Sequence, residues 1–392
     1  MGAQILAGTE SQPHAAAVLG PALPPVGQPS HAYLFHGPPG SGKRAAARAF
    51  AAALLSDRPG SGDAPDEAVV QRVQRGAHPD LTWVRPTGAA EMLVVDIDEP
   101  VVAAATRTPF EAARRVFVIE GADAMNDRAA NRLLKTLEEP PSFAHLILLA
   151  DRRQDVLPTI VSRCQLVRFD PLTPAAIEEL LGQERGADAE AAVSLPQSLA
   201  ACARLALGDA ELARELASPA GVALRGAAHA LLQAALPGEA SPASRPWGAL
   251  LDAAGARGAA AGEQVTAAVA AELDLLPAKE RRRREREGVD AARRAERRQR
   301  TRALDTGLSL VELWLRDMLC LAEDAPELAH ALDAADALQA DLAALRQGGG
   351  DPRRLPAAID HVAQTRLSLS QNVTEELALE ALSYRLAGVL AG

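Results

Sequence analysis

The sequence predicts an α/β domain built on a parallel sheet, followed by a region made of helices alone. Five short apolar runs alternate with helical patterns in the first 170 residues, and no comparable run follows Pro171. Aromatic residues make up only 3% of the chain, and long stretches consist of Ala, Leu, Arg and Glu, a composition that favours helices over an all-β sandwich. Short apolar strands separated by helices are typical of a parallel sheet covered on both faces.

The expected elements follow from these patterns in chain order. The strands are expected at 33–35, 80–84, 116–119, 146–149 and 166–169, with helices at 44–55 and 127–137 between them. Later helices are expected at 173–182, 195–217, 304–321 and 372–390, with Gly208 interrupting the second. Thr173 is placed to cap the first of these because Pro174 follows it. We therefore divide the chain into an α/β domain at 1–170, a helical lid at 171–217 and a helical domain at 218–392.

Composition excludes several classes of protein. The formal net charge of −10 argues against a basic nucleic-acid coat. The three cysteines, Cys164, Cys202 and Cys320, lie far apart, which predicts neither a disulfide framework nor a zinc site and fits a reducing cytoplasm. The first residues lack the pattern of a signal peptide, and no apolar run approaches the ~18 residues that a membrane helix needs. We expect a cytoplasmic protein without a membrane partner.

A candidate phosphate-binding loop follows the first strand and precedes a helix. Its residues are Gly37, Pro38, Pro39, Gly40, Ser41, Gly42, Lys43 and Arg44. In this context glycines let backbone N–H groups face a phosphate, and the following helix adds partial positive charge. Lys43 would reach the outer phosphates. The eighth position normally carries the Ser or Thr hydroxyl that binds Mg²⁺, and the guanidinium of Arg44 cannot bind a cation. A tight turn that binds nothing remains the alternative.

The other parts of a hydrolytic site are degenerate. The strand at 116–119 ends in Glu120, Gly121, Ala122 and Asp123, where a working ATPase would place an Asp-Glu pair. Glu120 is one methylene longer than Asp, and Gly121 has no side chain. Ala150 ends the next strand and cannot orient a water. The sequence therefore predicts a phosphate loop without Mg²⁺-dependent hydrolysis, and leaves open whether ATP or ADP binds there.

Three segments resemble the bacterial clamp-loader branch of the AAA+ ATPases. They are HAYLFHGPPG at 31–40, AANRLLKTLEEPP at 129–141 and LPTIVSRC at 157–164, and the resemblance extends to NVTEELALEAL at 372–382. It implies an AAA+ module, a small helical lid and a helical collar that holds the subunit in a ring. In that family a five-subunit loader opens the ring-shaped sliding clamp and places it on primed DNA. The resemblance is to a subunit of the loader that does not hydrolyse ATP.

The resemblance also assigns Ser162, Arg163 and Cys164. In the family, the arginine of this Ser-Arg-Cys motif enters the nucleotide site of a neighbouring subunit, where it stabilises charge on the γ-phosphate in trans. Ser162 and Cys164 are expected to be structural. The implied partners are the gamma/tau and delta subunits of the loader, the sliding clamp and primed DNA. The alternative for Arg163 is an ordinary loop arginine.

Two departures from the family bear on cofactors. Members often carry a four-cysteine zinc module after the first helix, but residues 56–79 contain no cysteine, so we expect no zinc. A loose alignment places Glu211 where hydrolysing subunits carry a nucleotide-sensing arginine.

The stretch at 279–302 carries twelve basic and five acidic residues, which give it a local charge of +7. Acidic residues interleave with arginines at helical spacings, and no aromatic residue lies within it to stack bases. The favoured interpretation is a charged helix or mobile insertion, and DNA contact is the alternative. The rival functions are an ATP-hydrolysing gamma/tau-type subunit and a DNA-binding module that acts through this stretch.

Overall fold

The computed structural model describes residues 6, 8–23, 27–57, 66–86, 91–187, 198–236, 245–273, 277–371 and 373–391. The described residues form two compact units, Met1–Ala176 with Gly208–Glu211, and Ile177–Leu207 with Leu212–Gly392. Each unit has its own hydrophobic core. The division into domains at 1–170, 171–217 and 218–392 stays a prediction.

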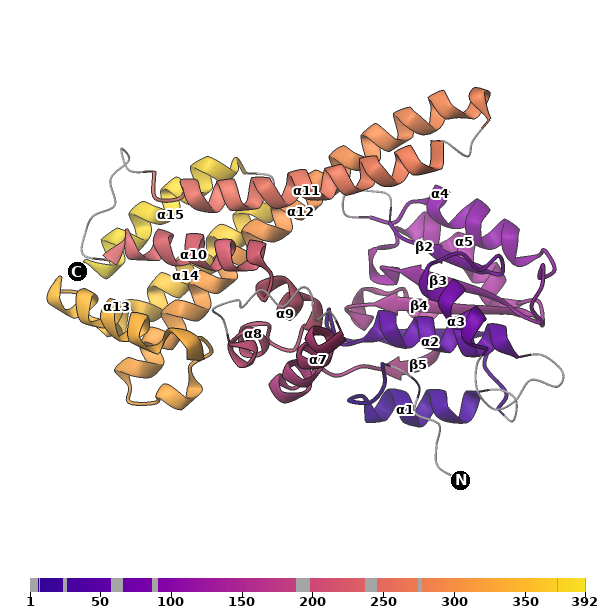
Figure 1. Cartoon of the computed structure of the whole chain (residues 1–392), viewed down its shortest axis with the longest axis horizontal. Coiled ribbons are helices and arrows are strands. Elements are labelled where there is room, and N and C mark those ends of the chain that lie inside the picture. The colour runs from indigo at the N-terminus through magenta and orange to yellow at the C-terminus, as the bar shows by residue number, and fades with distance from the viewer. Residues whose placement is uncertain are drawn as a thin grey trace. The chain divides into compact units, whose positions relative to one another are not determined.

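The first unit is built on a five-stranded parallel sheet with the order β2-β3-β4-β1-β5 (Figure 1). Its strands are β1 Ala32–His36, β2 Leu81–Val84, β3 Arg115–Glu120, β4 Ala144–Ala150 and β5 Gln165–Arg168. Its helices are α1 Pro13–Leu19, α2 Lys43–Ser56, α3 Glu67–Gln74, α4 Val94–Ile97, α5 Asp127–Glu138 and α6 Pro158–Val161. All five predicted strands are confirmed, with boundaries within two residues of those expected.

Both faces of this sheet are covered, because successive side chains of a strand point to opposite sides. In β1, Tyr33 and Phe35 pack with residues of α1, α2 and α3, whereas Ala32 and Leu34 pack with residues of α4, α5 and α6. The central strands β1, β3 and β4 are therefore largely apolar, as buried parallel strands require, whereas the edge strand β5 carries the exposed Gln165 and Arg168. The predicted parallel α/β sheet covered on both faces is confirmed.

Among the described residues no strand follows Arg168. The helices of this part are α7 Pro174–Ala187, α8 Leu199–Leu205, α9 Ala210–Leu216, α10 Pro219–Gln233, α11 Gly248–Leu273, α12 Ala278–Ala322, α13 Ala335–Gln347, α14 Leu355–Ser370 and α15 Glu375–Leu390. Thr173 caps α7 as predicted, since its hydroxyl accepts a hydrogen bond from the Ala176 N–H at 3.2 Å. Gly208, with φ +93°, separates α8 from α9 as predicted.

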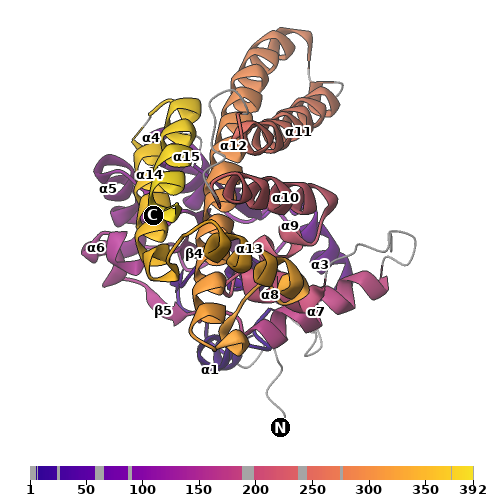
Figure 2. The same cartoon turned by 90° about the vertical axis from the view of Figure 1, so that its left-hand side faces the viewer.

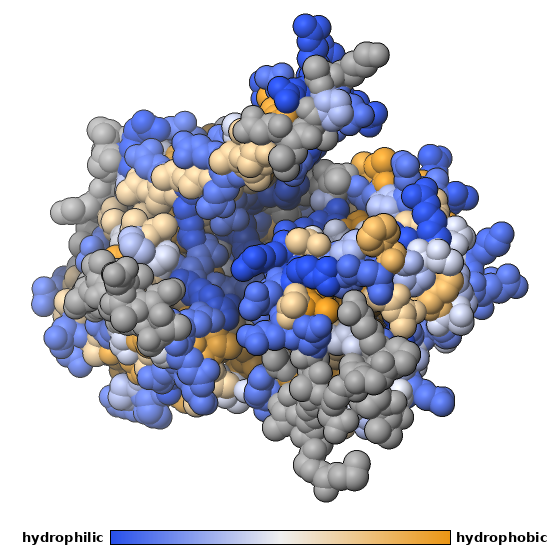
Figure 3. All heavy atoms as spheres, turned by 45° about the vertical axis from the view of Figure 1, so that its right-hand side comes forward, coloured by the Kyte–Doolittle hydropathy of each residue, from blue (hydrophilic) through white to orange (hydrophobic). Residues whose placement is uncertain are grey.

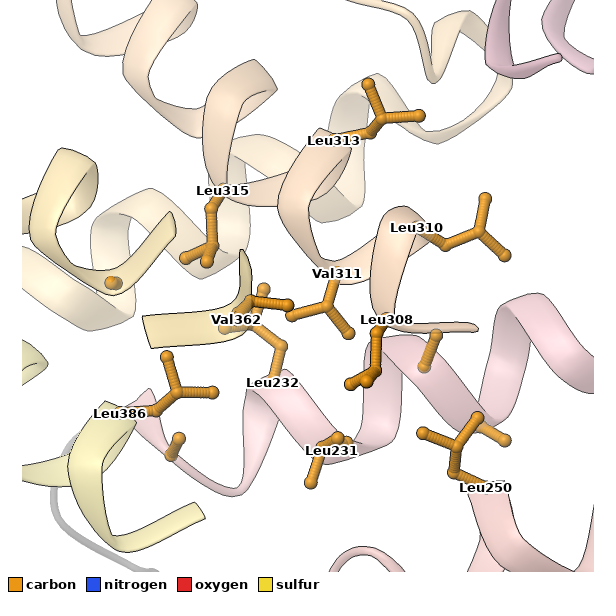
Figure 4. Packing of buried hydrophobic residues seen from close by; sticks show 14 of the residues in the cluster. Leu231, Leu232, Leu250, Leu308, Leu310, Val311, Leu313, Leu315, Val362 and Leu386 are labelled. Atoms are coloured by element: carbon orange, nitrogen blue, oxygen red, sulfur yellow. The ribbon is translucent and has the colours of Figure 1, made fainter. Parts of the chain in front are cut away.

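The second unit packs its helices around a core of leucines (Figure 4). Leu231 and Leu232 of α10 lie near Leu308 and Val311 of α12 in this core. The predicted helix at 304–321 is correct in type and too short: α12 is one helix of 45 residues that also contains the charged stretch at 279–302. Together α11 and α12 form a hairpin that extends beyond the leucine core, as Figures 1 and 2 show.

Among the described residues, no helix is both long enough and apolar enough to cross a bilayer.

Candidate functional site

The candidate phosphate loop connects the end of β1 to the start of α2, as predicted. Gly40 and Gly42 have φ values of +63° and +93°, in the left-handed region that favours glycine, and Gly42 immediately precedes the first residue of α2. The same sharp turn buries Ser41 and brings Gly37 against Phe169, directly after β5. The Gly37 N–H donates to the carbonyl oxygen of Ala150, the last residue of β4, at 3.3 Å. The backbone of a phosphate loop is therefore retained.

Lys43 is directed at the oxygen atoms of its own chain. Its Nζ donates to the carbonyl oxygens of Pro38, at 2.6 Å, and Gly37, and lies 2.9 Å from a carboxylate oxygen of Asp151. The Lys43 side chain is only 7% exposed, so its ammonium group is largely buried among these oxygen atoms. Asp151 directly follows β4, and parallel strands bring its carboxylate to the same sheet edge as the loop.

Arg44 binds two carboxylates from distant parts of the chain. Its Nε donates to Glu120 at 3.0 Å, and its Nη1 donates to both oxygens of Glu211 at 2.7 and 2.9 Å. Burial acts to lower the pKa of Arg44, but Glu120 and Glu211 outweigh it and raise that pKa above its ordinary value. A fixed positive charge thus stands where a magnesium-binding hydroxyl is expected.

Glu120 is buried and its carboxylate is fully engaged. Besides Arg44, it accepts hydrogen bonds from Trp83 Nε1 at 2.6 Å and from Arg85 Nε at 3.2 Å. The next residue, Gly121, adopts φ +73° and contributes no side chain. A carboxylate with three charged or polar donors is stabilised in place and has little left to offer a metal ion.

Asp123 has a structural position. Its Oδ2 accepts hydrogen bonds from the N–H groups of Asp151 and Arg152, both at 3.0 Å, so it holds the turn that follows β4. The structure therefore does not use Glu120 and Asp123 as an acidic pair: the first binds Arg44 and the second binds backbone. Among the described residues, no group of three or more His, Cys, Asp or Glu is arranged to hold a metal.

Sequence reasoning missed the acidic residue that packs on the loop from a distant segment. Ala210 N–H donates to the Gly40 carbonyl oxygen at 3.2 Å, and a Cβ placed on Gly40 would lie 1.8 Å from Asp209 Oδ1. Gly40 is thus required for this close approach as well as for its φ. The only signal in the sequence was the position of Asp209 directly after the helix break at Gly208.

The loop is surrounded by carboxylates more than by free cations. Asp151, Asp209 and Glu211 lie against Lys43, Gly40 and Arg44, respectively. Burial, together with the neighbouring cations Arg153, Arg168 and Lys43, lowers the pKa of His36, at the end of β1, so this imidazole is neutral near pH 7. Within the part of the chain that the structure describes, the residues at the loop do not fit a magnesium-bound nucleotide, because Arg44 stands at the metal position and the neighbouring carboxylates repel the phosphates.

Arg163 lies in the turn between α6 and β5. Its Nη2 lies 2.7 Å from Glu138 Oε1 at the end of α5, and its Nη1 donates to the Thr159 carbonyl oxygen at 2.9 Å. About a third of its side chain is exposed, so it is accessible from outside the unit. A charged, planar donor group held at a surface by one carboxylate suits exchange of that carboxylate for another anion.

Ser162 and Cys164 flank Arg163 in this motif. Ser162 Oγ donates to the Thr159 carbonyl oxygen at 3.1 Å. Burial raises the pKa of Cys164 to about 12, so its thiol is protonated at physiological pH and is a poor nucleophile. The roles assigned to Arg163 and to the loop stay predictions.

Comparison with known proteins supports the motifs on which the resemblance rests. Residues 18–173 match the family model described as "DNA polymerase III, delta subunit". The chain is 40% identical to the delta-prime subunit of Pseudomonas aeruginosa DNA polymerase III over 176 residues, which are 41% of this chain and 54% of that protein. It is 37% identical to the delta-prime subunit of Bacillus subtilis over 154 residues, which are 39% of this chain and 46% of that protein.

The same region also resembles a second type of subunit. It is 34% identical to the tau subunit of Bacillus subtilis DNA polymerase III over 149 residues, which are 38% of this chain and 26% of that protein. The chain therefore spans about half the length of the delta-prime relatives that it matches. Residues 18–173 are therefore similar to clamp-loader subunits of DNA polymerase III, delta-prime subunits among them.

Proposed function

We propose that the protein is a delta-prime-type subunit of a DNA polymerase III clamp loader that does not hydrolyse ATP itself. Its partners are then the gamma/tau and delta subunits, the sliding clamp and, through the assembled loader, primed DNA in the cytoplasm. The similarity to delta-prime subunits over residues 18–173 supports this assignment. The protein acts by assembly and by completing another subunit's site.

The observation that carries the absence of hydrolysis is the position of Arg44. Its guanidinium bridges Glu120 and Glu211 at the place where Mg²⁺ would be bound. Phosphoryl transfer depends on a metal ion and on a residue that orients the attacking water. Arg44 cannot supply the first, and Gly121 and Ala150 cannot supply the second.

We propose that ATP or ADP at the loop would be held through its phosphates and would not be hydrolysed. The loop keeps the backbone of a phosphate site, so ATP or ADP held there would use its N–H groups and Lys43. The carboxylates of Asp151 and Asp209 oppose that binding. We therefore expect weak binding that does not depend on Mg²⁺.

We further propose that Arg163 completes the nucleotide site of a neighbouring subunit. Its support is the Ser-Arg-Cys motif, the exposure of the side chain and its single carboxylate partner, Glu138. In an assembled loader, a γ-phosphate would take the place of Glu138 as the partner of the guanidinium. Such a contribution is worth about 10³–10⁵ in rate at one site.

The test is the ATPase activity of the loader reconstituted with its own partner subunits, clamp and primed DNA. Arg163→Ala is compared with wild type and with Arg132→Ala, a control that removes another exposed, ion-paired arginine near the same helix. We expect turnover to fall only with Arg163→Ala while the complex assembles normally. Unchanged turnover in an intact complex would contradict the role of Arg163 and leave a purely structural subunit.

A tau-type subunit that hydrolyses ATP is the second candidate, favoured by the 34% identity to Bacillus subtilis tau and by the retained Lys43. It predicts that the isolated protein hydrolyses ATP and that Lys43→Ala abolishes this activity. We expect no activity above that of Lys43→Ala. Measured turnover that disappears with Lys43→Ala would replace the first proposal by the second.

A further inference from the structure

The hairpin formed by α11 and α12 presents a row of arginines on the side that faces away from its own packing surface. We call the part of this hairpin from 248 to 302 the arm. Gly258 of α11 lies against the backbone of Glu296, and Gly288 of α12 lies against Val269. A Cβ at Gly288 would come within 2.6 Å of Val269 Cγ1, so these glycines let the two helices approach closely. The packing therefore fixes the rotation of α12 about its own axis.

The fixed rotation decides which side chains face outward. Gly288 is buried, and Arg284, Ala291, Ala292 and Ala295 are partly buried along the side that faces α11. Residues that recur at spacings of 4 and 7 share one face of a helix. The exposed residues on the opposite side at these spacings include Arg282, Arg286, Asp290, Arg293 and Arg297; we call the four arginines the basic stripe, and Asp290 lies among them. The stripe spans 16 residues of helix, and its ends are about 23 Å apart at the ordinary rise.

Two acidic residues of the arm pair with arginines that lie outside this stripe. Glu272 binds Arg284, and Glu287 binds Arg283, at 2.6 and 2.8 Å, so both acids pair with arginines outside the stripe. Among the described residues, no carboxylate lies within ion-pair distance of Arg282, Arg286 or Arg293. Hydrophilic side chains dominate the end of the arm, which is at the top of Figure 3.

The charge of the remaining chain restricts what can bind. The stretch at 279–302 carries +7 within a chain of net charge −10, so a polyanion is attracted to the arm and repelled by most of the rest. No Phe, Tyr or Trp occurs between residues 248 and 313, so the arm has no aromatic platform for unpaired bases. A straight row of guanidinium groups without stacking side chains suits the phosphates of a duplex.

We propose that the basic stripe binds the phosphate backbone of duplex DNA, independently of base sequence. The arginines act as positioning contacts, each releasing counterions from the phosphate that it meets. This inference goes beyond the proposed role in ATP hydrolysis and does not depend on Arg163.

The experiment measures binding of the full-length protein to a fluorescein-labelled 30-bp duplex at KCl concentrations between 50 and 200 mM. The stripe variant carries Arg282→Gln, Arg286→Gln and Arg293→Gln. The matched control carries Arg283→Gln, Arg294→Gln and Arg298→Gln, which remove the same charge from the flank of the same helix. Gln has nearly the helix propensity of Arg, and the helical circular-dichroism signal of both variants verifies that the arm is intact.

We expect the slope of log Kobs against log[KCl] to become shallower by about 2.7 in the stripe variant, because three phosphate contacts are lost at 0.9 each. The control variant should change this slope by less than about 0.9, the contribution of a single phosphate contact. Equal effects of the two variants, or no binding by the wild type at 50 mM KCl, would overturn the proposal.

Competition with poly-L-glutamate tests whether the partner of the basic stripe is duplex DNA or an acidic protein. We expect the duplex to bind more tightly than poly-L-glutamate of equal charge. Tighter binding of poly-L-glutamate through the same arginines would overturn the DNA assignment in favour of an acidic polypeptide. Since the assay contains no ATP and no other subunit, its failure would leave the proposed clamp-loader function untouched.

Discussion

The guanidinium of Arg163 lies 2.7 Å from a carboxylate oxygen of Glu138, so the residue assigned to a neighbour's nucleotide site is paired within its own chain. Because both side chains are substantially exposed, this ion pair contributes only about 0–1 kcal/mol to folding. An interaction that weak is readily exchanged for a more highly charged partner. The pair therefore orients Arg163 without binding it tightly.

The first prediction concerns Glu138→Gln. This change removes the competing carboxylate, and we expect the reconstituted loader to retain or increase its ATPase activity while the melting temperature of the isolated protein barely changes. The double variant Glu138→Gln/Arg163→Ala should be as slow as Arg163→Ala alone. A double variant as fast as Glu138→Gln would contradict a role for Arg163.

The second prediction concerns Arg44→Thr, which introduces a hydroxyl at the position that binds Mg²⁺ in hydrolysing subunits. We expect no ATPase activity from the isolated variant, because Gly121 and Ala150 still provide no group to orient water. Glu120 would lose one of its three donors, and we expect the free energy of unfolding to fall by about 1 kcal/mol. Urea unfolding measures the second effect. Activity gained by this single change would show that Arg44 alone blocks hydrolysis.

The third prediction concerns nucleotide affinity. Asp151→Asn removes a negative charge that lies 2.9 Å from Lys43 Nζ and leaves that ammonium free for a phosphate. We expect the affinity for a fluorescent ADP analogue to rise at least tenfold, since tenfold needs only about 1.4 kcal/mol and two unit charges about 4 Å apart interact by about 4 kcal/mol at an effective dielectric constant of 20. Asp155→Asn, which removes an exposed acid paired with Arg152, is the control. Equal affinities in the two variants would mean that Asp151 does not oppose binding.

The fourth prediction follows from a buried histidine in β4. His145 is 2% exposed, stacks on His31 and has its pKa lowered to about 4, chiefly by burial. The unfolded chain takes up this proton near pH 6.5 and the folded chain only near pH 4, so the stabilisation present above pH 6.5 is lost as the pH falls through this range. The loss attributable to His145 is roughly 3 kcal/mol.

Urea unfolding at several pH values measures this dependence. His145→Phe should flatten it between pH 6.5 and 4, and the exposed His14→Gln should leave it unchanged. A wild-type pH profile that His145→Phe does not alter would contradict a neutral His145.

The sheet was predictable because burial on both faces requires apolar runs, which are visible locally. The strand order was not: β1 lies between β4 and β5, more than 100 residues away in each case. The helical nature of 279–302 was one of two interpretations of its charge pattern. That it continues into the helix at 304–321 depends on contacts with α11, which its own residues do not reveal.

The candidate site, too, could be predicted only in part from the sequence. The losses at Arg44, Gly121 and Ala150 could be seen in the sequence, because each position is defined relative to a strand or to the glycine loop. The replacement contacts could not. Glu211 reaches Arg44 across 167 residues, and Asp209 meets Gly40 through backbone geometry with no sequence pattern of its own.

The length and continuity of α12 determine how it transmits a mechanical force. The helix is continuous over 45 residues, about 68 Å, and contains no proline, the residue most often responsible for a kink. Its first half carries the basic stripe, whereas Leu308, Leu315 and Met318 of its second half are completely buried in the leucine core. No proline separates the two halves, and hydrophobic packing holds the second half in place. A force applied near Arg282 would therefore be transmitted along α12 to the leucine core of the second unit.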